Sequence, residues 1–129
     1  MRSALLIALG LVIGILGTAF AISALHQRTP LPKAVMTVMA YHMSQLEHSV
    51  KAQQCDATAL RSNLERLQSA ALDIPGAFKG AEDPFMQASN KLQDSLKDAV
   101  AAAPGTCAAL ATALQPVDNA CDNCHKRFR

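Results

Sequence analysis

Tryptophan is absent from this 129-residue sequence, which has one tyrosine and four phenylalanines. Its β-branched residues are scattered rather than clustered, so the composition excludes a β-sheet protein. The formal net charge is only +2, and outside the last few residues the sequence has no stripe in which basic and aromatic residues alternate. We therefore expect no nucleic-acid partner. Alanine and leucine are abundant and the chain has room for one domain, which predicts an all-α fold.

The N-terminal segment lacks charge over residues 4–25. This run follows Arg2 and ends in the polar, basic stretch 26–28, which is typical of a secretory signal or a signal anchor. Residues 19–21, Ala-Phe-Ala, fit a signal-peptidase site, whereas about 22 apolar residues can also cross a bilayer uncut. We expect residues 1–28 to be a signal peptide or a transmembrane anchor. The rest would be periplasmic, either soluble or tethered to the inner membrane.

Residues 33–129 predict a bundle of four helices. Two prolines, Pro30 and Pro32, mark a linker, so the first helix should begin near Lys33. Apolar residues then recur at three- and four-residue spacing, which places them on one face of each helix. The four faces are Met36, Met39, Met43, Leu46 and Val50; Leu60, Leu64, Leu67 and Ala71; Phe85, Ser89, Leu92, Leu96, Ala99 and Ala103; and Leu110, Leu114, Val117, Cys121, Cys124, His125 and Phe128.

Capping and turn residues separate these helices. Asp56 and Thr106 can cap the second and fourth helices, and Asp83-Pro84 suits the start of the third. Ile74-Pro75-Gly76 and Pro104-Gly105 should end the helices that precede them. Short connections place successive helices side by side in opposite directions, so we expect an antiparallel up-down-up-down bundle.

The fourth predicted helix has two features of its own. Pro116 removes one backbone hydrogen bond inside it, and we expect a kink there. Its cysteine motif continues the apolar stripe, so whatever the motif binds should be buried in the bundle.

The motif Cys121-Asp122-Asn123-Cys124-His125 is typical of covalent haem attachment. Two thiols one helical turn apart can reach the vinyl groups on one haem edge, and the adjacent histidine can ligate the iron. A thioredoxin-like dithiol shares the spacing but follows a strand, and a zinc site would need Cys55 and Cys107 nearby. Neither alternative uses His125, so we expect one haem c per chain.

Cys55 and Cys107 fall in the first and third predicted connections. In an up-down-up-down bundle these connections share one end, so the two residues can form a disulfide in an oxidising compartment. Closing this loop would stabilise the fold by roughly 3 to 4 kcal/mol in the chain-entropy model. The alternative is two free, buried thiols.

The C-terminal sequence Cys-Asp-Asn-Cys-His-Lys-Arg-Phe-Arg, residues 121–129, resembles the cytochrome c-prime family, whose last helix ends Cys-x-x-Cys-His-x-x-Tyr/Phe-Arg. Residues 35–43 look like the distal-side helix of that family, and residues 74–78 resemble its middle loop. The resemblance covers residues 33–129 and implies a haem-binding four-helix bundle.

Met36 separates the two functions that the resemblance implies. His125 would be the proximal iron ligand, and Met36 would face the opposite side of the iron. As a sixth ligand it would give a low-spin electron carrier, whereas as an apolar blocker it would leave a five-coordinate iron that binds nitric oxide or carbon monoxide. We expect one-electron transfer, without enzymatic catalysis, and keep gas binding as the alternative. Two other histidines are weaker candidate ligands. We expect His42 to be a surface or capping residue on another helix face, and His48 to be solvated.

Charged residues near the motif suggest how haem and a partner are held. The family often pairs an arginine with a haem propionate where this chain has Pro32, which leaves Lys33, Arg127 and Arg129 as substitutes. Lys126 joins Arg127 and Arg129 in a basic cluster that can steer docking to an acidic redox partner, although solvation or propionate pairing explains it at least as well. The resemblance also implies homodimers through the first two helices. A haem-free, membrane-tethered interaction bundle is the third alternative.

Overall fold

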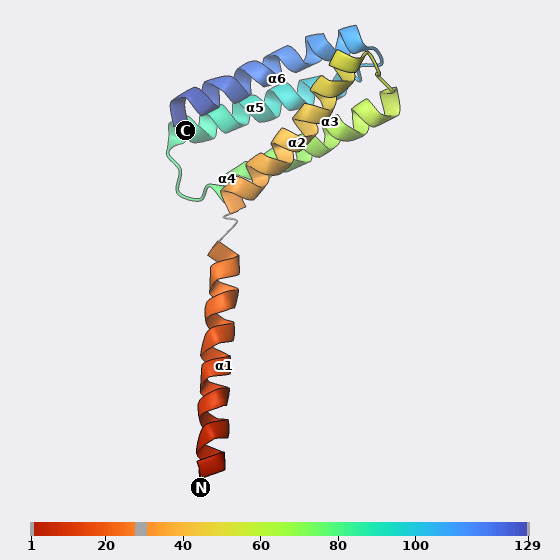
Figure 1. The fold of residues 1–129 in the computed structure, drawn as a ribbon. Helices are drawn as coiled ribbons and strands as arrows, with labels where there is room; N and C mark the ends of the chain where they lie inside the picture. The colour runs from red at the N-terminus through yellow and green to blue at the C-terminus, as the bar shows by residue number, and fades with distance from the viewer. Residues whose placement is uncertain (1, 28–30, 129) are drawn as a thin grey trace.

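The structure, a computed structural model, describes residues 2–27 and 31–128, with the side chains of the first helix given for residues 7 and 9–23. This part of the chain is helical and contains no strand (Figure 1), which confirms the all-α prediction. The helices are α1 Arg2–Gln27, α2 Leu31–Ala52, α3 Ala57–Leu72, α4 Ile74–Ala77, α5 Asp83–Ala101 and α6 Cys107–Phe128.

Helices α2 to α6 form one packed unit. Helix α2 packs against α3 and α6, and α5 packs against the same two helices, while the short α4 contacts α2, α3 and α5. Helix α1 projects away from this unit (Figure 1) and, where it is described, makes no contact with it. Within the described residues, no helix is long and apolar enough to cross a membrane.

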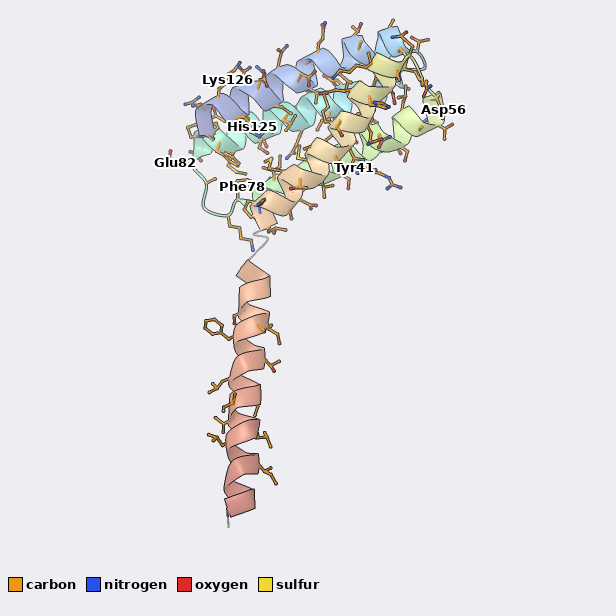
Figure 2. The ribbon with its side chains drawn as sticks, viewed as in Figure 1. Tyr41, Asp56, Phe78, Glu82, His125 and Lys126 are labelled. Carbon is orange, nitrogen blue, oxygen red and sulfur yellow. A yellow bond between two sulfur atoms is a disulfide. The ribbon has the colours of Figure 1, made fainter. Side chains whose placement is uncertain are left out.

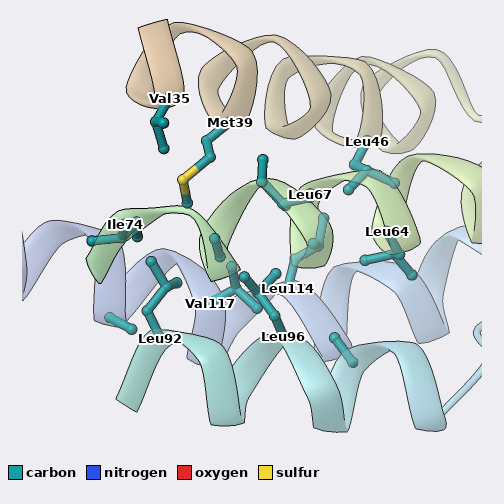
Figure 3. Close-up of a cluster of buried hydrophobic side chains, with 14 of the residues drawn as sticks. Val35, Met39, Leu46, Leu64, Leu67, Ile74, Leu92, Leu96, Leu114 and Val117 are labelled. Atoms are coloured by element: carbon teal, nitrogen blue, oxygen red, sulfur yellow. The ribbon is translucent and has the colours of Figure 1, made fainter. Parts of the chain in front are cut away.

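The predicted apolar faces meet in one core. Figure 3 shows Met39 and Leu46 of α2 facing Leu67 of α3, with Val117 of α6 and Leu96 of α5 beneath them. Burial of each large apolar side chain contributes roughly 1.5–3 kcal/mol, so these faces hold the helices together. Three residues of the predicted faces are exposed instead: Ala103, which lies beyond the end of α5 with a positive φ of 42°, and His125 and Phe128 in the last turn of α6.

The predicted caps of α3 and α6 are confirmed. Asp56 Oδ1 accepts a hydrogen bond from the backbone N–H of Ala59 at 2.8 Å, and Thr106 Oγ1 accepts one from Ala109 at 3.2 Å. Each bond satisfies a backbone donor that the helix itself leaves unpaired.

Two predicted boundaries are wrong, and one short helix was not predicted. Helix α2 begins at Leu31, so Pro32 lies in its first turn, where the missing N–H costs nothing. Residues 29 and 30 of the expected linker lie outside the described residues. The N-cap of α5 is Glu82 rather than Asp83, which lies in the first turn and complements the helix dipole there. Helix α3 ends at Leu72, directly before residues 74–76, as predicted, but these residues also form most of the short helix α4, which was not predicted.

Helix α6 runs without a break from Cys107 to Phe128 and contains Pro116. The cysteine motif is therefore carried on the same helix as the buried Leu110, Leu114 and Val117. The kink expected at Pro116 stays a prediction.

Candidate functional site

The two thiols of the motif border a cavity that is partly open to solvent. Cys121 and Cys124 are free and half-buried, and both line a cavity of about 290 Å³ between the helices. They are three residues apart on α6, so they lie on one face of the helix about one turn apart. The sequence prediction that both cysteines face the bundle interior is confirmed.

His125 also lines this cavity, but its side chain is exposed at the rim. The prediction that His125 continues the buried apolar face of the helix is therefore wrong. The physical reason is its place in the last turn of α6, beyond the packed stretch that ends with Val117 and Ala120. Figure 2 shows His125 and Lys126 at this end of the helix.

The cavity wall is mostly apolar. Met39, Leu92 and Val117 are buried around it, and Met36 and Met43 are half-buried beside them. Three methionines of α2 thus face the cysteines of α6. The remaining apolar lining residues are Ala40, Leu67, Ile74 and Phe85. The polar ones are Ser44, Glu47, Ser89 and Asp118.

A second cavity, of about 480 Å³, adjoins the first. Met36 and His125 border both cavities, so the structure brings the two predicted iron ligands to the junction between them. The other shared residues are Ala40, Phe85 and Cys124, and Lys33, Thr37, Phe78 and Phe128 complete the second lining.

Three aromatic rings bound the second cavity. The Phe85 ring centroid lies 4.8 Å from that of Phe78 and 5.4 Å from that of Phe128, the latter pair in an edge-to-face arrangement. Such contacts favour a fixed ring geometry. The cluster joins the connection after α4 to α5 and to the end of α6.

Burial raises the pKa of both motif thiols. The pKa of Cys121 rises to about 11, mainly through loss of hydration and further through the charges of Asp118, Cys124 and Asp122. Burial alone raises the pKa of Cys124. Both residues are therefore thiols rather than thiolates at neutral pH, and a thiol is the less oxidisable form.

The two rival histidines do not line either cavity. His42 is only 8% exposed and lies 3.0 Å from Asn63 Oδ1, measured from its Nδ1. The prediction that it is a surface or capping residue is wrong, because Asn63 supplies a polar partner inside the α2–α3 interface. His48 is exposed, as expected.

The basic residues predicted to hold propionates or a partner are spread around the site. Lys33 borders the second cavity, and the Arg127 guanidinium lies 5.3 Å from the ring centroid of Phe128. Lys126 is exposed and lies 3.7 Å from Asp122. Arg129 lies outside the described residues. Among the three of these residues that the structure describes, Lys33 is the one that lines a cavity.

Cys55 and Cys107 form the predicted disulfide, with 5.4 Å between their Cα atoms. Asp56, next to Cys55, and His125 are at opposite ends of the packed helices in Figure 2. The four cysteines therefore form two separate pairs, which excludes the zinc site that would use all of them. Over the described residues, no group of three or more His, Cys, Asp or Glu side chains is placed to hold a metal ion.

Sequence reasoning missed the carboxylates of Glu47 and Asp118, which line the first cavity. A signal for Asp118 was present, because it precedes Cys121 by three residues and so shares its helix face. No such signal existed for Glu47, since its place beside α6 depends on how α2 packs.

No protein-family model, curated protein or solved structure matches this chain. The residues and their geometry are therefore the basis for assigning a function.

Proposed function

We propose that this protein is a c-type cytochrome, of the cytochrome c-prime kind, that carries one covalent haem and transfers single electrons in the periplasm. The observation that carries the proposal is that Cys121, Cys124, His125 and Met36 all border one largely apolar cavity. The donor set fits this group, because a porphyrin supplies most of the iron ligands itself. One histidine and one thioether are then enough, and no larger cluster of ligating side chains is needed.

The two cysteines would hold the haem by thioether bonds. Each thiol would add across one vinyl group, its sulfur bonding to one carbon and its hydrogen going to the other, with no net oxidation. The raised pKa of Cys121 and Cys124 supports this role. It keeps both groups in the thiol form, which resists oxidation to a disulfide before haem arrives.

His125 and Met36 would be the residues that hold the haem iron, one through its imidazole and the other through its thioether. Bound haem supplies reversible one-electron reduction of its iron, and the protein makes no bonds in that step, so it is not an enzyme. The apolar cavity wall would exclude water and help to set the potential. Lys33, Arg127 and Arg129 remain the candidates for pairing with propionates, and the basic C-terminal end could meet an acidic redox partner.

The proposal includes an antiparallel up-down-up-down bundle and an export leader. The bundle is supported by the disulfide, which ties the connection between α2 and α3 to the one between α5 and α6. The same bond supports export, because disulfides persist in oxidising compartments. Cleavage of the leader after Ala21 would release a soluble periplasmic protein, and retention would leave it tethered to the inner membrane.

A five-coordinate haem that binds nitric oxide or carbon monoxide is the second candidate. The half-buried Met36 favours it as well, because a flexible thioether can fill space beside the iron without ligating it. The two functions differ in one observable, the response of the haem to added gas.

The test is to produce the full chain in a bacterium with c-type haem-maturation machinery and to stain a denaturing gel for haem. Covalent haem should appear on the wild-type chain and be lost from Cys121→Ser/Cys124→Ser. The matched control is Cys55→Ser/Cys107→Ser, which removes two cysteines away from the cavity and should keep haem. A colourless wild-type protein would contradict the proposal and favour a haem-free interaction bundle.

A further inference from the structure

Two carboxylates line the cavity where α2 packs against α6. Glu47, on α2, is half-buried, and Asp118, on α6, is exposed at the rim. Asp118 lies one turn before Cys121, so it is next to the edge at which the proposed haem would be attached. The position of these two acids, beside a largely apolar cavity, is not explained by attachment or ligation.

The surroundings of Asp118 contain little positive charge. Glu47 acts on it from α2 and Asp122 from α6, and both are negative. Each of these two acids is itself paired with a lysine: Lys51 lies 3.7 Å from Glu47, and Lys126 lies 3.7 Å from Asp122. The other titratable residues that line the cavity are His125 and the two motif cysteines, all on α6. The residues contributed by α3, α4 and α5 have no titratable side chain: Leu67 of α3, Ile74 of α4, and Phe85, Ser89 and Leu92 of α5.

We propose that Asp118 is a proton-binding residue whose protonation is coupled to the redox state of the haem, with Glu47 setting its proton affinity. This inference rests on the proposed function. When a one-electron donor, a redox protein or an electrode, supplies the electron that would reduce the bound haem from ferric to ferrous, one proton would pass from solvent to the Asp118 carboxylate. Charge in the cavity then stays constant.

The coupling follows from Coulomb interaction across a medium less polar than water. Reduction removes one positive charge from the haem, which makes the nearby Asp118 carboxylate less stable and strengthens its hold on a proton. Its pKa is already raised, first by burial and then by the charges of Glu47 and Asp122. Asp118 therefore takes up its proton at a pH closer to neutral than an ordinary exposed aspartate does.

The charge of Asp118 determines the direction in which the haem midpoint potential changes with pH. An ionised Asp118 favours the ferric state, so the midpoint potential should fall as rising pH removes the proton. The slope has an upper limit of about 59 mV per pH unit, the value for one proton per electron. Salt should weaken the effect, since Asp118 is exposed to solvent.

The experiment is a spectroelectrochemical titration of the holoprotein between pH 4 and pH 9, roughly the range around a raised carboxyl pKa. Asp118→Asn should match the wild-type potential at the acid end, exceed it at neutral pH, and lose the pH-dependent fall. Glu47→Gln should keep the fall but move it to lower pH, because a negative neighbour of Asp118 is gone. Glu65→Gln is the matched control, an exposed acid on α3 paired with Arg61 away from the cavity, and should behave as wild type.

A pH dependence that is unchanged in Asp118→Asn would assign the proton to the haem propionates and overturn the inference. A wild-type potential that does not vary with pH would also overturn it. In both cases the protein still carries haem, so these results are distinguishable from failure of the proposed function, in which no haem signal is present. Circular dichroism and haem content would show that each variant is folded and loaded before its potential is compared.

Discussion

The Nδ1 nitrogen of His42 on α2 lies 3.0 Å from the Oδ1 oxygen of Asn63 on α3. Asn63 donates from Nδ2 to the Ala59 carbonyl at 3.1 Å, so its Oδ1 is the acceptor and the His42 ring nitrogen the donor. Because His42 is buried, this hydrogen bond is a polar link inside an otherwise apolar helix interface.

Replacing Asn63 with leucine should leave the His42 N–H without a partner. We expect the free energy of unfolding to fall by about 1–3 kcal/mol, the cost of an unsatisfied buried group. Urea denaturation measures it, with Asn90→Leu as the matched control because Asn90 is exposed on α5. The double variant His42→Leu/Asn63→Leu should recover part of this loss. If its loss instead equals the sum of the losses of His42→Leu and Asn63→Leu, the two residues are not coupled.

Removing the disulfide should destabilise the fold without affecting haem attachment. Cys55 and Cys107 are 52 residues apart, so Cys55→Ala/Cys107→Ala should lose about 4 kcal/mol in the chain-entropy model. Thermal or urea unfolding of wild type and variant, followed by circular dichroism, gives the difference. Equal haem content in the two proteins would separate this structural bond from the thiols of the cavity. A loss of haem together with the disulfide would contradict that separation.

The helices and the disulfide could be predicted because they depend on local rules. Residues such as Leu60, Leu64 and Leu67 repeat with the period of a helix, and Asp56 is a residue that caps one. The disulfide required one more step, the expectation that two connections share an end. That step succeeded because short connections leave successive helices few alternatives.

The errors arose where the outcome depends on a residue on another helix. His42 was expected at the surface, since its partner Asn63 is 21 residues away and on α3. Glu47 and Asp118 belong to different helices, so their joint position at the cavity follows from packing that periodicity does not describe. At Pro32 and Pro75 the error was local, because proline is accepted in the first turn of a helix as well as in a linker.

Replacing Met36 with leucine should change the coordination of the haem. If Met36 ligates the iron, wild-type protein gives a low-spin spectrum that does not respond to carbon monoxide. Met36→Leu removes the sulfur while keeping an apolar side chain of similar size, so it should become high-spin and bind the gas. Met43→Leu is the matched control, since Met43 lines the first cavity but not its junction with the second.

A wild-type spectrum that is already high-spin and shifts with carbon monoxide would identify Met36 as a blocker. The gas-binding candidate would then replace electron transfer as the function. Ultraviolet-visible spectra of the oxidised and reduced protein, before and after gas addition, are enough to decide between the two.

The thiol of Cys121 should react slowly when the chain is made without haem-maturation machinery. Its pKa of about 11 leaves little thiolate at pH 8, so the rate of alkylation by iodoacetamide should rise about tenfold per pH unit and continue to rise beyond pH 9. Measuring the rate by mass spectrometry in a Cys124→Ser background makes the signal specific to Cys121.

Asp118→Asn should speed the reaction near neutral pH, because a negative charge that disfavours the thiolate is gone. The matched control is Asp94→Asn, at an exposed position on α5, which should have no effect. In denaturant, the rate should stop rising once the pH passes the ordinary cysteine pKa of about 8.5. A folded chain whose rate also levels off there would show that burial does not protect this thiol, and the protection of Cys121 before haem attachment would have to come from outside the protein.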